Sequence, residues 1–244
     1  SILWMLQNDE SIYMLTAVLS VLVMIYYFFA AKHYSNNFIN NIIEKENVLH
    51  TQHELIRRLG KASEYKDNET GMHIARMSYY CYLLAKESGC SDSFSKNILY
   101  ASTMHDVGKI GIPDSILLKP GKLDKDEFET MKSHSEIGKK ILEGSDAKLL
   151  ILAESIAYTH HEKYDGTGYP RGLKEDEIPL EGRITAICDV FDALVSKRPY
   201  KDGWSNEKAI SLIQEESGKH FDPKLVEHFM NILPDVLKYQ KNHQ

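Results

Sequence analysis

The fold class of this chain is decided by the stretch LLILAESIAYTHHEKYDGTGYP, residues 149–170. Its first half is apolar without the alternation of a strand, and its second half is a polar loop with glycine and proline. This pattern indicates a helix that ends at two histidines and is followed by a long loop. Helical patterns extend from about residue 61 onward, with a second Gly- and Pro-rich loop over 108–121. We therefore predict an all-α domain over residues 61–238.

Capping residues mark where several of these helices begin. Asp124 and Glu127 have the spacing of a capping box, which predicts a helix from there to Ile141. Ser145 or Asp146 is expected to cap the apolar helix that follows. The remaining signals are the apolar run 184–195, Ser205 as a cap, and Asp222 followed by Pro223.

Residues 12–31 form an almost unbroken apolar run without a charged side chain. A helix of about 20 residues spans about 30 Å, the thickness of the bilayer core. We therefore predict a single transmembrane helix after an N-terminal flank, residues 1–11, rather than a core helix or an uncleaved signal segment. Asp9 and Glu10 precede the run and Lys32 follows it, which places the C-terminal bulk in the cytoplasm, at the inner membrane.

Residues 32–60 link the apolar run to the helical domain. Apolar side chains recur there with the spacing of an imperfect heptad, which predicts a helical stalk for a parallel homodimer. The alternative is a helix that packs on its own domain. The chain begins at Ser1 without a methionine, which is expected of a fragment of a longer sensor protein.

The overall charge restricts the ligands that the chain can attract. Its formal net charge is -6, so a general nucleic-acid surface is not expected. A phosphate ligand would need local positive charge from metal ions or a few Lys and Arg side chains. The 3 cysteines are scattered, which indicates reduced thiols in a cytosolic domain rather than a disulfide framework.

Histidines and carboxylates in unusual places are the candidate functional residues. Asp189 lies inside the apolar helix ITAICDVFDALV, where a carboxylate is costly to bury unless it is paired or bound to a cation. Glu69 and His73 are four residues apart, so on a helix they share one face. The adjacent pair His105 and Asp106 can reach a metal from a helix end.

Taken singly, each of these residues has an ordinary structural interpretation, as do His134 and the pair His160 and His161. As a set, imidazoles and carboxylates on several helices of an all-α domain indicate a metal centre. Mixed nitrogen and oxygen ligands suit Fe, Mn, Zn, Ni or Co rather than Ca or Cu(I).

Three motifs resemble those of the HD-GYP family, a subset of the HD phosphohydrolase superfamily: HDVGKIGIPD at 105–114, HHEKYDGTGYP at 160–170 and DVFDALVSKRPYK at 189–201. The resemblance covers about residues 60–235. It implies that the fold is an HD-type helical bundle. It also implies that the chain is a metal-dependent phosphodiesterase that hydrolyses cyclic di-GMP to pGpG or onward to GMP in bacterial signalling.

The resemblance also implies a ligand set for two divalent ions, with Fe or Mn expected and Zn, Ni or Co as alternatives. Some family members hold a third ion through a glutamate four residues before the first histidine, where this chain has Glu69, so the site is expected to be dinuclear or trinuclear. The ligands carried over are Glu69, His73, His105, Asp106, His134, His160, His161 and Asp189.

Substrate contacts are implied by the same motifs. Asp106 would bridge two ions with its two oxygens, and Lys109 would be catalytic and contact the scissile phosphate. Arg198 and Lys201 resemble the family's contacts to the substrate phosphate and guanine. Arg198 can hold a phosphate bidentately or stack on a base. The loop DGTGYPRG follows the histidine pair, and within it Asp165, Gly166, Gly168, Tyr169 and Pro170 form the stretch that names the family. Asp165 and Tyr169 of this loop are expected to contact the substrate.

Alternative functions remain open from the sequence. The enzyme can be specific for another cyclic dinucleotide such as cyclic GMP-AMP, or the domain can be a non-catalytic receptor for such a nucleotide. A membrane scaffold that acts only through protein contacts would leave Lys109 and the ligand set unexplained. The family loop is also proposed to dock diguanylate cyclases, and the sequence does not choose between docking and substrate shaping.

Overall fold

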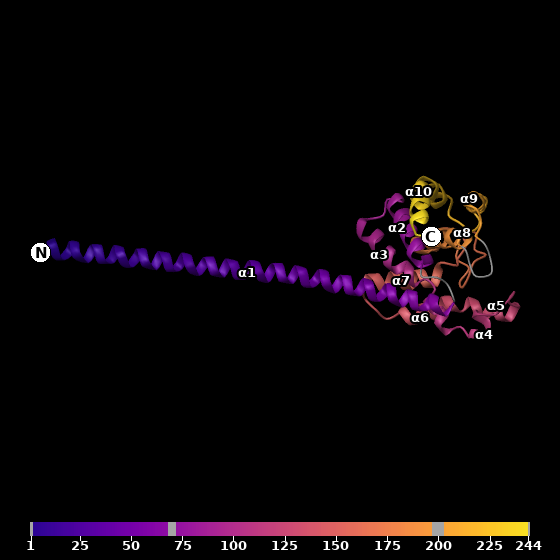
Figure 1. The fold of residues 1–244 in the computed structure, drawn as a ribbon, viewed down its shortest axis with the longest axis horizontal. Coiled ribbons are helices and arrows are strands. Elements are labelled where there is room, and N and C mark those ends of the chain that lie inside the picture. The colour runs from indigo at the N-terminus through magenta and orange to yellow at the C-terminus, as the bar shows by residue number, and fades with distance from the viewer. Residues whose placement is uncertain (1, 68–71, 197–202, 244) are drawn as a thin grey trace. The chain divides into compact units, whose positions relative to one another are not determined.

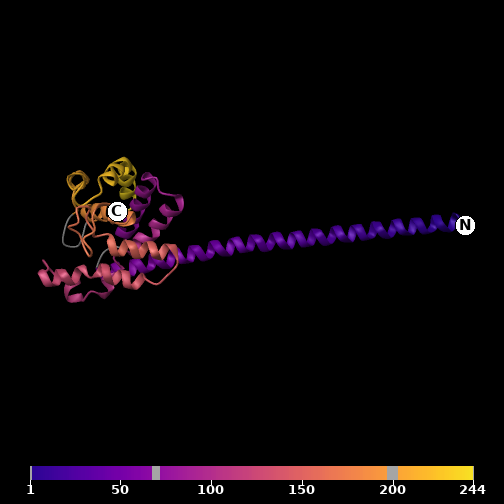
Figure 2. The same cartoon turned by 180° about the vertical axis from the view of Figure 1, so that it is seen from behind.

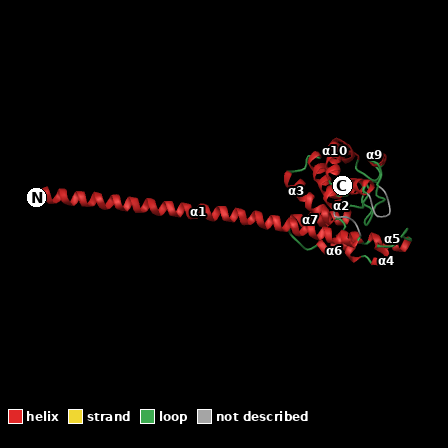
Figure 3. Ribbon diagram, viewed as in Figure 1, coloured by secondary structure: helices red, strands yellow, loops and turns green. Residues whose placement is uncertain are grey.

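The computed structural model describes residues 2–67, 72–196 and 203–243, with side chains described from residue 9 onward. The chain divides into two compact units, Ser1–Gln52 and His53–Gln244. The described residues form helices and loops without a β-strand (Figure 3). The predicted all-α class is therefore confirmed, whereas the predicted division at 11, 31 and 60 stays a prediction.

Helix α1 runs over Ile2–Lys66 and includes all of the described part of the first unit. Every described side chain from residue 9 to residue 52 is exposed, including the apolar ones. By length and composition, α1 is the one helix in the described parts of the chain that could cross a membrane. The apolar helix that the sequence predicted is thus present, and its place in a membrane stays a prediction.

The second unit is a bundle of helices around one core (Figures 1 and 2). In both views α2 lies beside α8 and α10, and α6 lies along α7. The α-helices after α1 are α2 Met72–Glu87, α3 Asp92–Ala101, α4 Asp114–Leu117, α5 Lys125–Lys132, α6 His134–Leu142, α7 Lys148–Thr159, α8 Leu180–Val195, α9 Asn206–Glu215 and α10 Pro223–Asn242. Short 3₁₀ helices are η1 Ser102–Met104, η2 Val107–Gly111 and η3 Glu175–Glu177.

The apolar faces of α2, α3, α7, α8, α9 and α10 contribute to the core of the bundle. The ring of Phe191 is fully buried and packs edge-on against Tyr80 and Phe229, at centroid distances of 6.1 and 5.2 Å. Such edge-to-face pairs stabilise a core beyond the area that they bury. Because α2 and α8 are held in this way, the polar residues that they carry at the edge of the core have fixed positions.

Three predicted caps are present in the structure. Asp124 and Glu127 form the complete capping box of α5, and the side chains of Ser205 and Asp222 accept hydrogen bonds from the first turns of α9 and α10. The predicted cap of α7 is wrong. Ala147 occupies that position without a side-chain hydrogen bond, because the hydroxyl of Ser145 accepts from the amide of Ala147 instead of from the helix.

The predicted single helix from Asp124 to Ile141 is also wrong, because the chain breaks at Ser133 into α5 and α6. The hydroxyl of Ser133 donates to the carbonyl of Thr130 at 2.6 Å, and Nδ1 of His134 donates to the carbonyl of Met131 at 2.8 Å. These side chains take carbonyls that a continuing helix would use. The break places His134 at the start of α6.

Glycine at position 108 allows η2 to approach α6 closely. A Cβ atom on Gly108 would lie 1.9 Å from the carbonyl oxygen of His134, far inside van der Waals contact. The residue therefore brings the segment that carries His105 and Asp106 against the first turn of α6. This contact places the motif at 105–114 next to the candidate ligand His134.

Candidate metal centre

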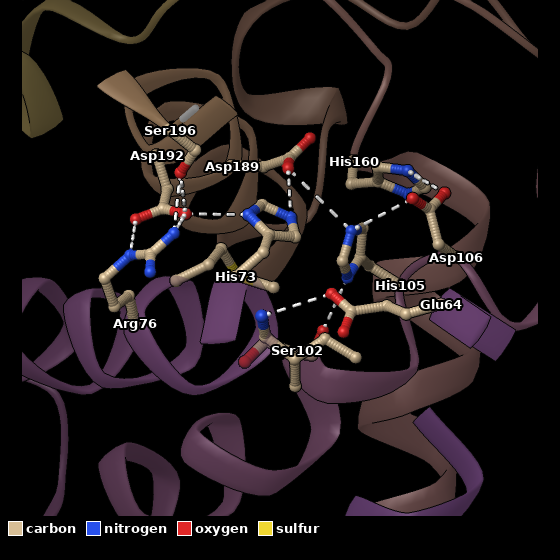
Figure 4. A network of polar contacts seen from close by, with 12 residues as sticks. Glu64, His73, Arg76, Ser102, His105, Asp106, His160, Asp189, Asp192 and Ser196 are labelled. Carbon is tan, nitrogen blue, oxygen red and sulfur yellow. Dashed lines mark hydrogen bonds and ion pairs between the residues drawn. The ribbon is translucent and has the colours of Figure 1, made fainter. Parts of the chain in front are cut away.

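The structure brings together seven of the eight predicted metal ligands in two adjacent groups. Within each group, one ligand atom from each residue lies within 4.8 Å of the others. The first group is Asp106, His134, His160 and His161, and the second is His73, His105 and Asp189. They come from α2, the η1–η2 junction, the start of α6, the end of α7 and the middle of α8, and Figure 4 shows several of them converging.

Asp106 connects the two groups through its two carboxylate oxygens. Its Oδ1 lies 3.3 Å from Nε2 of His134 and 3.7 Å from Nε2 of His160, both in the first group. Its Oδ2 lies 3.2 Å from Nε2 of His105 in the second group. A carboxylate that turns one oxygen to each group has the arrangement of a bridging ligand between two ions.

Asp189 is the carboxylate of the second group, as Asp106 is of the first. Its Oδ1 lies 3.2 Å from Nε2 of His73 and 3.8 Å from Nε2 of His105 (Figure 4). The carboxylate comes from the middle of an apolar helix, as the sequence pattern suggested. Within the described parts of the chain, its ion-pair partners are these two histidines.

Three of the histidines are oriented by main-chain carbonyls. Nδ1 of His105 donates to Ser102 at 2.9 Å, and Nδ1 of His160 donates to Ile156 at 3.0 Å. His134 makes the same kind of bond within its own segment. Since a carbonyl only accepts, Nδ1 carries the proton, and in the neutral ring Nε2 presents a lone pair toward the carboxylates.

The donor set fits divalent metal ions. Nε2 of His105, Nε2 of His160 and Oδ1 of Asp106 are buried and have no hydrogen-bond partner within the described ranges. Buried polar atoms of native proteins are normally satisfied, so such a cluster needs an explanation. Cations between these nitrogen and oxygen atoms would provide it.

The protonation states of the carboxylates favour cation binding. Burial opposes ionisation of Asp106, but the charges of Lys109 and His105 outweigh it and hold the pKa of Asp106 well below its ordinary value. Burial likewise opposes ionisation of Asp189, but the hydrogen bond from His73 and the charge of His105 lower its pKa. Both groups are therefore negatively charged at neutral pH.

The pKa is lowered for two of the site histidines and raised for two others. Burial lowers the pKa of His134 to about 4, and burial together with the charge of His160 holds the pKa of His161 well below its ordinary value. Burial also disfavours the charged forms of His73 and His105, but the adjacent carboxylates raise the pKa of His73 well above its ordinary value and that of His105 to about 9. A bound cation would replace the protons on these two rings.

His73 has a carboxylate partner, Asp192, that was not among the predicted site residues. Its Nδ1 lies 2.8 Å from Oδ2 of Asp192. Arg76 donates one hydrogen bond to each carboxylate oxygen of Asp192, and Ser196 donates to Oδ2 (Figure 4). Asp192 is fully buried on the same apolar helix as Asp189, three residues later. The signal that singled out Asp189, a carboxylate in an apolar run, was present at Asp192 as well.

Lys109 lies beside Asp106, as its predicted catalytic role requires. Its ammonium nitrogen is 2.9 Å from Oδ2 of Asp106 and 2.5 Å from Oδ2 of Asp67, just beyond the end of α1. Lys66 donates to the carbonyls of Ile110 and Ile112, both at 2.7 Å. The end of α1 is therefore attached to the segment that carries Lys109.

The loop after the histidine pair covers one side of the centre. The ring of Tyr169 stacks on His161 at a centroid distance of 4.7 Å. Glu162 is buried and accepts from the amides of Arg171 and Leu173, at 2.8 and 3.0 Å. A Cβ atom on Gly168 would lie 2.2 Å from the amide nitrogen of residue 163, so this tight turn requires glycine.

Asp165 is not part of the two ligand groups. Its carboxylate is exposed and accepts from the amide and the hydroxyl of Thr167, at 2.9 and 2.7 Å, within the loop itself. Its contact with substrate stays a prediction. Glu69, Arg198 and Lys201 lie outside the described residues, and so do the predictions made for them.

Comparison with known proteins places this arrangement in a family. The HD domain matches residues 39–225. The chain is 51% identical over 177 residues to "3'3'-cGAMP-specific phosphodiesterase 2" of Vibrio cholerae, covering 72% of this chain and 34% of that protein. It is 47% identical over 192 residues to a "Cyclic di-GMP phosphodiesterase" of Thermotoga maritima, covering 78% of this chain and 52% of that protein.

A solved structure shares the fold. It is the crystal structure of a cyclic GMP-AMP-specific phosphodiesterase of Vibrio cholerae, V-cGAP3, with a TM-score of 0.59 and 20% sequence identity, covering 76% of this chain and 50% of that chain. The present chain thus spans about half or less of the length of the proteins that it matches. The resemblance that its motifs predicted is confirmed, and this chain belongs to the HD domain family.

Proposed function

We propose that this chain is a metal-dependent phosphodiesterase that hydrolyses cyclic di-GMP to pGpG, and onward to GMP, in bacterial second-messenger signalling. The observation that carries the proposal is the pair of ligand groups joined by the carboxylate of Asp106. Two adjacent cation sites match the chemistry of in-line displacement at a phosphodiester. The named activity of the relative from Thermotoga maritima supports the choice of substrate.

The residues that would hold the ions are those of the two groups, with Asp106 between them. Fe or Mn is the proposed metal, with Zn, Ni or Co as alternatives, and Glu69 would serve a third ion. Such ions supply Lewis acidity to the phosphoryl oxygens and lower the pKa of a water molecule. Water then adds across one P–O bond, and the sugar oxygen that leaves takes up a proton.

The protein would contribute positioning and charge. Asp106 and Asp189 are anionic and would hold the ions, while Lys109, beside Asp106, would place a positive charge near the negative charge that develops on the phosphate. Tyr169 is held on His161 and can stack on a base of the substrate. Arg198, Lys201 and Asp165 are proposed as further substrate contacts.

A second substrate is favoured by one specific observation. The relative with 51% identity is named as specific for 3'3'-cGAMP, so this chain can have the same preference. The two nucleotides differ in one base, and base contacts decide between them. A non-catalytic receptor is disfavoured because seven of the predicted ligands converge.

The first unit is proposed to anchor the enzyme. Residues 12–31 would cross the inner membrane once and leave the catalytic unit in the cytoplasm. Their exposed apolar side chains and the length of α1 support this placement. Residues 32–60 would pair with a second copy as a homodimer stalk, and the loop at 165–170 would dock a diguanylate cyclase.

The test is the hydrolysis of both nucleotides by the full chain in detergent micelles. Protein loaded with Mn or Fe is incubated with cyclic di-GMP or with 3'3'-cGAMP, and the products are separated by chromatography. We expect a linear product that disappears after chelation and returns after addition of metal. Metal-loaded protein that binds a nucleotide without turnover would establish the receptor function instead.

A further inference from the structure

We propose that Asp192 is a positioning residue for His73, that Arg76 holds Asp192 in place, and that this pair maintains the metal position formed by His73, His105 and Asp189. The inference rests on the proposed metal-dependent function. It deepens that function, because it assigns two buried residues to one of the two ion positions.

His73 differs from the other oriented histidines in the partner of its Nδ1 atom. His105, His134 and His160 donate to main-chain carbonyls three or four residues away. His73 instead meets a carboxylate from α8, 119 residues later in the sequence. Its orientation therefore depends on one side chain and on the packing of α2 against α8.

Asp192 is held from several directions. Nε and Nη2 of Arg76 donate to its two oxygens at 2.7 and 2.8 Å, which is the bidentate geometry that Arg forms with a carboxylate. The hydroxyl of Ser196 donates to Oδ2 at 3.0 Å. Asp192 has no exposed side-chain surface, so its rotamer is fixed by these contacts and it can hold the ring of His73 in one orientation.

The consequence for His73 follows from the tautomer. A carboxylate at Nδ1 keeps a proton there, so a cation bound at this position would replace the proton on Nε2, which lies 3.2 Å from Oδ1 of Asp189. Carboxylate partners of this kind orient metal-bound histidines and make them more basic, and their loss typically lowers metal affinity about 10- to 100-fold.

A purely structural role is the competing explanation, because Arg76 and Asp192 also join α2 to α8. A matched control separates the two roles. Asp222 is another buried carboxylate with an arginine partner, Arg183, at 2.7 Å, and it caps α10 through the amide of Lys224. It belongs to neither ligand group, so Asp222→Asn tests the cost of weakening a buried ion pair alone.

The experiment compares full-length wild type, Asp192→Asn and Asp222→Asn. Metal content is measured by mass spectrometry after dialysis, affinity by titration with Co²⁺ followed by its visible spectrum, and stability by thermal unfolding in chelator. We expect Asp192→Asn to retain about one metal equivalent less, or to bind Co²⁺ about 10- to 100-fold more weakly at one position. Asp222→Asn should match wild type in both metal readouts.

The inference is overturned if Asp192→Asn keeps the stoichiometry, affinity and Co²⁺ spectrum of wild type, whatever its stability. If Asp192→Asn does not fold, Arg76→Lys serves instead, since it keeps the positive charge and removes the bidentate contact. A wild-type metal profile in that variant would also overturn the proposal. A wild type without turnover, whose metal is still lost in Asp192→Asn, would contradict the proposed activity and leave this inference standing.

Discussion

Asp67, just after the last residue of α1, lies with its carboxylate 2.5 Å from the ammonium of Lys109. Lys109 is at the same time 2.9 Å from Asp106, so its charge is shared between two carboxylates. A substrate phosphate that reaches Lys109 competes with both of them for its charge. Asp67 is the one that can be displaced, because Asp106 belongs to the ligand groups.

Asp67→Asn should therefore favour substrate binding. The variant removes a negative charge that competes with the phosphate, and we expect KM for the cyclic dinucleotide to fall about 3- to 10-fold, the size of a partly exposed ion pair of about 1 kcal/mol. Steady-state kinetics with detergent-solubilised full chain would measure this change. Glu54→Gln, which weakens an exposed ion pair on α1, is the control. A higher KM in Asp67→Asn would mean that Asp67 supports Lys109 instead.

Asp106→Ala should remove both metal positions. Because its two oxygens face different groups, the variant is expected to lose most of its bound metal and to lower kcat at least about 100-fold. Metal analysis and product chromatography on one preparation would show both effects. Asp146→Asn, at an exposed carboxylate before α7, should behave as wild type. Equal turnover by Asp106→Ala would refute the assignment of the site.

Removal of metal should destabilise the His53–Gln244 unit. A ligand at about 100 times its Kd stabilises the folded state by about 2.7 kcal/mol, which corresponds to roughly 5–10 °C in Tm for a unit of this size. We expect chelation to lower Tm by that amount and added Mn to restore it, as measured by circular dichroism at 222 nm. The Tm of Asp106→Ala should not respond to either treatment.

Glu162→Gln should loosen the loop that carries Tyr169. The carboxylate accepts from two amides, and an amide side chain has only one accepting oxygen, so one part-buried N–H loses its partner at a cost of about 1 kcal/mol. Trypsin should cut after Lys163 or Lys174 faster than in wild type, and KM should rise as Tyr169 loses its place. The exposed Glu136→Gln on α6 is the control, and equal cleavage rates in both variants would contradict the expectation.

The helical class and three caps could be predicted because the responsible interactions are local. Asp124, Ser205 and Asp222 each act on amides two or three residues away, so the sequence pattern contains the whole interaction. The break at Ser133 was not predicted, because the helical pattern does not show that the side chains of Ser133 and His134 bond to the carbonyls of Thr130 and Met131.

Most of the ligand groups could be expected from residue types and motifs, whereas their supporting contacts could not. Asp192 showed the same pattern as Asp189, but only the packing of α2 on α8 distinguishes a partner of His73 from a ligand. Asp67 is a polar residue just after a helix, and its partner Lys109 is 42 residues away. Such pairings follow from the tertiary fold rather than from local sequence.

The main-chain carbonyls that orient His105, His134 and His160 have a consequence for how such a protein can evolve. A carbonyl is present whatever side chain the residue carries, so Ser102, Met131 and Ile156 could change without removing the acceptor. Mutations near these three histidines are then tolerated as long as the turns keep their backbone paths. The Nδ1 partner of His73 is a side chain, so a mutation of Asp192 would remove the acceptor and selection would act against it.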